Sequence, residues 1–301
     1  MSTAELNHEA KRTVPVDRVL FPHVEVAAFT NSGLQRANNE DVFVVDDRTF
    51  SNLPEYGIHT SLGRSAALVF AVCDGMGGHE GGEIAALAAA EAVSGAERPS
   101  LTPERLVEII KSANRQIYDL AESEDGFAGM GSTLVAAVLW PDSDGATIAN
   151  VGDSRAYLID ADGQIRALTN DQADPQGNLL QAMGGQPRYM DVDVAITHPV
   201  SLGGGVLVLC SDGVSNLLSP AQLAAAFSDQ HPGPLCASFP KLARLLADGG
   251  ADDNVSLVAV RQSVEPVPTG QCSEVFAEAF RSLAAPDPTR PEVANRGSRE
   301  P

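Results

Sequence analysis

Cysteine is scarce in the 301-residue sequence, and none of its four cysteines forms a C-x-x-C pair. A zinc site built from paired thiolates is therefore excluded. Cys73 and Cys210 each lie in a short apolar run typical of a buried strand. We expect both to be reduced and buried, as cysteines in such runs usually are. The other two are Cys236 and Cys272.

Basic residues are also few: 20 lysines and arginines stand against 40 aspartates and glutamates, which gives a net charge of −20 at pH 7. A fold with this excess of acid is not expected to bind the phosphate backbone of a nucleic acid. The same excess suits a soluble protein or one that gathers cations.

The sequence contains no apolar run long enough to span a membrane and no segment typical of a secretory signal peptide. We therefore expect a cytoplasmic protein that makes no contact with a membrane. Hydrophobic residues make up 44% of the chain, which is enough to build the core of one large domain or two small ones.

Short apolar runs separated by turn residues dominate the sequence and predict many strands. These runs lie at residues 24–30, 42–45, 67–73, 132–140, 146–151, 155–159, 164–168, 190–196, 205–210 and 255–260, and helices are predicted at 83–93, 103–122, 220–227 and 240–247. Residues 46–66 are expected to form an irregular surface connection. The whole pattern favours an α+β fold, an antiparallel β-sandwich flanked by pairs of helices.

The stretch from Ala67 to Gly82 combines an apolar strand, an Asp74-Gly75 pair and a glycine-rich loop that leads into a helix. Glycines allow the backbone to approach a ligand closely or to adopt positive φ. The stretch therefore predicts either a ligand site or a tight strand-to-helix turn capped by Asp74.

Several acidic residues stand at the ends of predicted strands. Asp74, Asp153 and Asp212 each follow a strand, whereas Glu40-Asp41 and Asp253 each precede one. In an antiparallel sheet the end of one strand lies beside the start of its neighbour, so these carboxylates are expected to meet at one rim of the sandwich.

Carboxylates crowded in this way raise one another's pKa values, and divalent cations remove the repulsion. A ligand set of oxygen atoms alone favours Mg²⁺ or Mn²⁺, and two such ions can activate water for attack on phosphorus. Arg36 supplies a planar guanidinium suited to phosphate oxygens. In the alternative interpretation each acid merely caps a turn.

The same residues form six ordered motifs: R-A-N-N-E-D (36–41), V-C-D-G-M-G-G-H-E-G-G-E (72–83), G-S-T-L (131–134), A-N-V-G-D-S-R (149–155), L-C-S-D-G (209–213) and D-D-N-V-S (252–256). In this order they resemble the metal-dependent serine/threonine protein phosphatases, the protein phosphatase 2C or PPM family, of bacterial type. The resemblance implies a phosphatase domain at residues 23–262 with the four-layer αββα form of the family's sandwich. A polar lead-in (1–22) and a segment of linker, short amphipathic helix and disordered tail (263–301) would flank it.

The resemblance further implies two Mn²⁺ or Mg²⁺ ions and a third, weaker one. The residues expected to hold them are Glu40, Asp74, the Gly75 carbonyl, Asp153, Asp212 and Asp253. Among the catalytic residues, Arg36 would clamp the phosphate, Asp41 would act through coordinated water, and Asp74 would bridge two metals. A hydroxide between these metals would attack phosphorus without a phosphoenzyme intermediate.

The chain departs from the family at two places. Met76 stands where some members have a histidine proposed as the general acid, and residues 170–189 are shorter than the flap segment usual in bacterial members. His79 lies close to Met76 but in a glycine loop, where a structural role is favoured. The other histidines are scattered and show no ligand spacing: His8, His23, His59, His198 and His231.

The resemblance implies that the partners are phosphorylated proteins, which are substrates of a bacterial Ser/Thr kinase. The enzyme would reverse the signalling of this kinase. The chain is expected to be a monomer. Two alternatives stay open. One is a phosphatase-like sensor or scaffold without turnover, and the other is the same site serving a small phosphoester or a regulatory anti-anti-sigma phosphoprotein.

Overall fold

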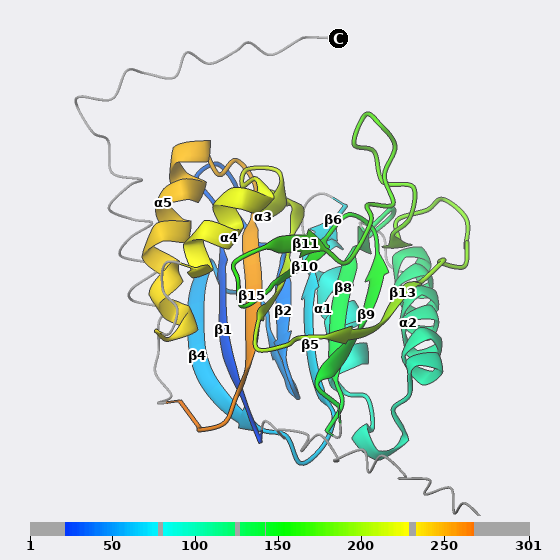
Figure 1. Ribbon diagram of the computed structural model, residues 1–301. Coiled ribbons are helices and arrows are strands. Elements are labelled where there is room, and N and C mark those ends of the chain that lie inside the picture. The colour runs from blue at the N-terminus through cyan, green and yellow to red at the C-terminus, as the bar shows by residue number, and fades with distance from the viewer. Residues whose placement is uncertain (1–21, 78–80, 124–126, 142, 229–232, 268–301) are drawn as a thin grey trace, which may run out of the picture.

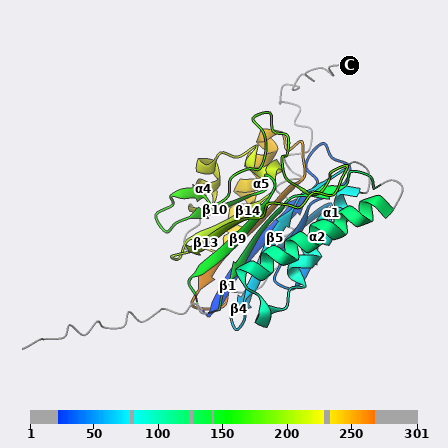
Figure 2. The same ribbon diagram turned by 90° about the vertical axis from the view of Figure 1, so that its right-hand side faces the viewer.

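The computed structural model describes residues 22–77, 81–123, 127–141, 143–228 and 233–267, apart from the side chains of His198 and Pro199. Two six-stranded antiparallel sheets stack face to face, and helices cover the outer face of each (Figures 1 and 2). The predicted α+β class, a β-sandwich flanked by pairs of helices, is therefore confirmed. The predictions for residues 1–21, for His79 and for the tail from 268 onward lie outside the described residues.

The first sheet has the strand order β11-β10-β14-β15-β1-β4. Its strands are β1 (His23–Asn31), β4 (Glu55–Gly63), β10 (Arg155–Ile159), β11 (Ile165–Ala167), β14 (Val206–Cys210) and β15 (Val255–Ser263). Its outer face is covered by α4 (Pro220–Ser228), the 3₁₀ helix η2 (Leu235–Ser238) and α5 (Phe239–Gly249).

The second sheet has the order β13-β9-β8-β5-β2-β3. Its strands are β2 (Val42–Val45), β3 (Arg48–Phe50), β5 (Leu68–Cys73), β8 (Leu134–Leu139), β9 (Gly145–Val151) and β13 (Ala195–Ser201). Helices α1 (Gly81–Ser94) and α2 (Pro103–Ser123) cover it. A small third sheet joins β6 (Gly75–Met76), β7 (Gly131–Ser132) and β12 (Met183–Gly184), and the short elements η1 (Arg98–Ser100) and α3 (Asp212–Ser215) complete the fold.

Four inner strands, β2, β5, β8 and β14, are apolar and buried along their whole length because both faces of each sheet are covered. Along β1, Val26 and Ala28 face the core between the sheets, whereas Ala27 and Phe29 face helix α5. Continuous apolar runs are the sequence pattern that such doubly covered strands require. Cys73 and Cys210 are fully buried, as expected.

The prediction for residues 46–66 was wrong, because this segment contains β3 and the nine-residue edge strand β4. Strand β4 pairs with all of β1, from His23 opposite Gly63 to Asn31 opposite Glu55. Its partly exposed edge position allows polar residues, and Pro54 and Gly57 gave it the composition of a turn. The strand predicted at 190–196 instead begins at Ala195, where pairing with β9 starts, so Asp191 and Asp193 precede it.

No helix among the described residues is both long and apolar enough to cross a membrane.

The Phe29–Phe239 contact tests the packing of α5 on the first sheet. Both rings are fully buried, with centroids 5.2 Å apart and edge to face. Phe239→Ala should lower the free energy of unfolding by about 3–5 kcal/mol, because it removes a large buried ring and leaves a cavity. Leu180→Ala, at a side chain that is 62% exposed, should change it by less than about 0.5 kcal/mol. Urea unfolding measures both, and equal losses would contradict this packing.

Candidate active site

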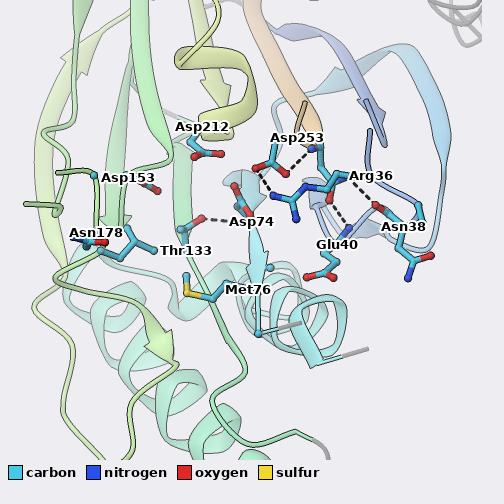
Figure 3. A pocket seen from close by; sticks show the side chains of 16 residues that line it. Arg36, Asn38, Glu40, Asp74, Met76, Thr133, Asp153, Asn178, Asp212 and Asp253 are labelled. Carbon is cyan, nitrogen blue, oxygen red and sulfur yellow. Dashed lines mark hydrogen bonds and ion pairs between the residues drawn. The ribbon is translucent and has the colours of Figure 1, made fainter. Parts of the chain in front are cut away.

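A pocket of about 630 Å³ lies at one end of the sandwich (Figure 3). The residues that line it include seven singled out from the sequence: Arg36, Glu40, Asp74, Gly75, Asp153, Asp212 and Asp253. The pocket is also lined by Met76, Asn38, Thr133, Asn178 and Asn254. The structure thus brings together Arg36 and Asp253, which are 217 positions apart in the chain.

The acids reach the pocket from separate strand ends. Asp74 follows β5, Asp153 follows β9, and Asp212 follows β14 as the first residue of α3. Glu40 and Asp253 stand just before β2 and β15, which pair with β5 and β14 respectively. The antiparallel ladders therefore place the ends and starts of neighbouring strands at the same rim.

Asp41 differs from the other predicted site residues because it lies below the pocket and does not line it. Its carboxylate is buried, with 1% of the residue exposed, and accepts a hydrogen bond from the Ser211 hydroxyl at 2.9 Å through Oδ2. Its Oδ1 has no protein partner. Burial raises the pKa of Asp41 to about 7, and the neighbouring charges of Asp212 and Asp253 add to this effect.

Burial and mutual repulsion raise the pKa values of the pocket carboxyls as well. The pKa of Asp74 lies well above its ordinary value because of burial, the charges of Asp41 and Asp212, and a hydrogen bond with the Asp212 carboxyl. Burial and the charge of Asp212 raise the pKa of Asp153 to about 6. Burial also raises the pKa of Glu40.

This electrostatic situation fits a divalent cation. The donors are carboxylate oxygens and a backbone carbonyl, the ligands that Mg²⁺ and Mn²⁺ prefer. Among the described residues, Arg36 is the one basic side chain that lines the pocket. No three acidic, histidine or cysteine side chains in the described parts of the chain form a ready-made ligand cage, so the acids line the walls without closing on one point.

The glycines of the loop after β5 allow Glu40 to sit directly against the start of α1. A Cβ atom on Gly82 would lie 2.0 Å from Glu40 Oε2, and one on Gly75 would lie 2.2 Å from the Gly82 carbonyl oxygen. Both distances are far below van der Waals contact. The glycines at these two positions are therefore required by close approach, and not by turn formation alone.

Neutral side chains fix the backbone beneath the acids. The Asp74 N–H donates to Thr133 Oγ1 at 3.1 Å, and the Thr133 N–H donates to the Asp74 carbonyl at 2.9 Å. Asn254 accepts from the Glu40 N–H at 2.8 Å and donates to the Asn38 carbonyl at 2.8 Å. Thr133 and Asn254 both belong to motifs identified in the sequence, but their hydrogen bonds to the backbone near the acids were not predicted. The position of both residues within these motifs was the signal that could have indicated them.

Arg36 stands at the edge of the pocket, and 57% of its side chain is exposed. Its Nη2 donates to Asp253 Oδ2 at 2.9 Å. Across the pocket, Asn178 belongs to the irregular segment 170–189, which is tied to the sheet by an ion pair between Arg155 and Asp171 at 2.5 Å. The guanidinium and Asn178 thus lie on opposite sides of the acids (Figure 3). The side-chain amide of Asn178 donates to Asp174 Oδ2 at 2.9 Å.

Comparison with known proteins agrees with the resemblance found in the sequence. The family pattern described as Protein phosphatase 2C matches residues 57–249. A serine/threonine phosphatase, stp, of Listeria innocua is 30% identical over 218 residues, which covers 64% of this chain and 84% of that protein. The Mycobacterium tuberculosis serine/threonine protein phosphatase PstP is 28% identical over 275 residues, 84% of this chain and 47% of PstP.

Solved structures agree with this comparison. A bacterial serine phosphatase superposes with a TM-score of 0.66 at 25% identity, covering 80% of this chain and 99% of that one. The catalytic domain of PstP in complex with two manganese ions superposes with a TM-score of 0.61 at 26% identity, covering 79% and 98%.

The sandwich with an acidic pocket at its rim is the architecture of a serine/threonine protein phosphatase. The chain belongs to the protein phosphatase 2C family, as its six motifs indicated.

The raised pKa of Asp41 makes the stability of the metal-free protein depend on pH. The folded state holds this proton up to a pH of about 7, whereas the unfolded chain releases it near 4. The free energy of unfolding should therefore fall as pH rises from about 4 to 7. Asp41→Asn removes this loss. At pH 8 the variant should therefore have a higher free energy of unfolding than the wild-type protein, and the difference should decrease toward pH 5. Urea unfolding in EDTA measures the difference, and an equal difference at both pH values would contradict it.

The crowded acids also predict a response to metal. Mn²⁺ should raise the Tm of the wild-type protein, because binding to the folded state alone stabilises it, and EDTA should reverse the shift. Differential scanning calorimetry measures the effect. No shift on titration to millimolar Mn²⁺ would count against a shared cation site.

Proposed function

We propose that this protein hydrolyses phosphoserine and phosphothreonine in phosphorylated proteins, at a site that holds two Mn²⁺ or Mg²⁺ ions. The observation that carries the proposal is the meeting of acids from separate strand ends in one pocket, with no basic lining residue but Arg36 among those described. The PstP complex with two manganese ions supports the choice of metal.

We assign the ligand roles to Glu40, Asp74, the Gly75 carbonyl, Asp153, Asp212 and Asp253, with Asp153 and Asp212 serving a weaker third ion. When bound, the metal ions supply positive charge that lowers the pKa of water and offsets the charge of the phosphate. Asp41, directly below, would accept a proton or a hydrogen bond from a water through its unpartnered Oδ1.

Arg36 would orient the substrate. Its guanidinium is exposed and paired with Asp253 at the pocket edge, so it can exchange this partner for two phosphate oxygens. Met76 lines the pocket but carries no exchangeable proton, so we propose that water protonates the leaving serine or threonine oxygen.

The same relatives support a physiological role. The proteins stp and PstP are named serine/threonine phosphatases, which supports phosphoproteins made by a bacterial Ser/Thr kinase as the substrates. We further propose that residues 23–262 act as a monomeric catalytic domain in the cytoplasm. Reduced, buried Cys73 and Cys210 are consistent with that compartment.

Asp74→Asn tests the metal assignment. The variant should lose phosphate release from a phosphothreonine peptide by about 100-fold or more, because the central carboxylate is removed from the site. Asp191→Asn, at an exposed carboxylate paired with Lys111 outside the pocket, should retain wild-type rates. Near wild-type turnover by Asp74→Asn would contradict the assignment of Asp74 as a metal ligand. Wild-type protein that binds Mn²⁺ but releases no phosphate at any metal concentration would favour the sensor or scaffold alternative.

Arg36→Ala tests the phosphate contact. The loss of charge-assisted hydrogen bonds to the phosphate should raise KM for the peptide by about 10-fold or more. Arg166→Ala removes the same charge from an exposed position on β11 and should leave KM unchanged. Steady-state kinetics at saturating Mn²⁺ measures both, and equal effects of the two variants would argue for a general charge effect instead.

A further inference from the structure

A second cluster of ionisable side chains lies on the outer face of the first sheet, away from the pocket. It consists of Glu25 on β1, His59 on β4, Arg261 on β15 and Cys236 on η2. Glu25 and Arg261 are directly opposite each other in the ladder, and His59 lies on the next strand. From Glu25 to Asn31, at the pocket end of β1, the strand covers about 20 Å.

Glu25 is the buried anchor of this cluster. It lies 2.8 Å from His59 Nε2 through Oε1, which also accepts from the Leu235 N–H at 2.7 Å. Its Oε2 accepts from Arg261 Nη2 at 2.6 Å and from Nε at 3.1 Å. Burial alone would raise the pKa of Glu25, but the hydrogen bonds of His59 and Leu235 and the charge of Arg261 bring it below its ordinary value.

His59 connects this carboxylate to the sulfur of Cys236. The ring hydrogen-bonds the Cys236 side chain, and since Nε2 is taken by Glu25, Nδ1 is the nitrogen available to the sulfur. The hydrogen bonds with Cys236 and Glu25 raise the pKa of His59 to about 9. The charges of Cys236 and Glu25 also favour the charged form of the imidazole.

Cys236 is half-buried, whereas Cys73 and Cys210 are fully buried. The order of groups is therefore the thiol of a half-buried cysteine, an imidazole beside it, and a carboxylate that orients the imidazole. This order activates a cysteine for nucleophilic attack, because the thiolate is the reactive form and the imidazole takes its proton.

We propose that Cys236 is a reactive thiolate, formed by proton transfer to His59 and oriented through Glu25, and that it is a site of covalent modification by peroxides and alkylating agents. With a peroxide, the sulfur attacks one oxygen, an S–O bond forms and the O–O bond breaks. The cysteine is oxidised to a sulfenic acid, and the departing hydroxide takes the proton of His59 to become water. With iodoacetamide, an S–C bond forms, the C–I bond breaks and iodide leaves.

The rate of alkylation of Cys236 by iodoacetamide tests the proposal on the full chain. At pH 6.5 an ordinary thiol with a pKa of about 8.5 is roughly 1% ionised. Cys236 in the folded protein should therefore react about 10-fold or more faster than in the urea-unfolded chain, even with the lower intrinsic nucleophilicity of an acidic thiol. Its rate should be nearly flat from pH 6.5 to 8. Peptide mass spectrometry follows this one cysteine among the four.

His59→Gln should give Cys236 an ordinary profile, with a rate that rises about tenfold per pH unit up to about 8.5. The groups that face the sulfur in the described cluster are His59, Glu25 and Arg261, and the variant removes only the base. His23→Gln, a histidine substitution at the start of β1, is the matched control and should leave the rate unchanged. At pH 6.5, hydrogen peroxide should produce a dimedone-trapped sulfenic acid at Cys236 in the wild-type protein only.

A thiol that merely donates its proton to His59 for structural reasons would behave differently. It would react in the folded protein no faster than in urea, with the ordinary pH profile, and either result would overturn the proposal. If His59→Gln fails to fold by circular dichroism, the comparison of folded and unfolded wild-type protein still decides. Cys236→Ser should abolish labelling at this peptide and leave phosphate release unchanged.

Discussion

The repulsion between carboxylates at the rim of the sandwich is the constraint on which the rest of the site depends. Asp41 is buried and Asp74 is half-buried, both within electrostatic reach of Asp212 and Asp253, and their pKa values rise accordingly. A flexible chain would relieve this repulsion by moving the acids apart. Here each acid is fixed by the end of a strand that is paired on both sides or by the loop before it, so the repulsion stays in the folded state until a cation or a proton removes it.

The groups that bond the backbone of Asp74 and Glu40 and the carboxylate of Asp41 are neutral. Thr133 and Asn254 bond the backbone beside Asp74 and Glu40, and the Ser211 hydroxyl bonds Asp41. Lysine or arginine in these positions would stabilise the metal-free protein more, because they would pair with the acids internally. They would also cancel the negative potential that draws a divalent cation into the pocket. The stability of the empty site and its affinity for metal are thus opposed.

The sequence predicted the features that depend on where strands begin and end. It did not predict how deeply a side chain is buried, or strands whose sequence pattern is weak. Apolar strands followed or preceded by acids located the pocket, because antiparallel pairing brings such positions together. The burial of Asp41 below its neighbour Glu40 could not be predicted, since adjacent residues point to opposite faces and the face was unknown. Strand β4 was missed because an edge strand tolerates polar residues. The contact of His59 with Cys236 depends on packing η2 onto β4, which no local pattern records.

Glu25 on the outer face of the first sheet and Asp74 at the rim of the sandwich show two different environments of a carboxylate. Glu25 is buried, but His59, Arg261 and the Leu235 N–H satisfy it from within the chain, and its pKa is lowered. Asp74 is half-buried in the wall of the pocket, but its neighbours are other acids, and its pKa is raised. A carboxylate with internal partners has no need of an ion, whereas one surrounded by acids requires a cation from outside to stay charged. The difference in partners therefore separates the cluster that orients a histidine from the cluster that can hold metal.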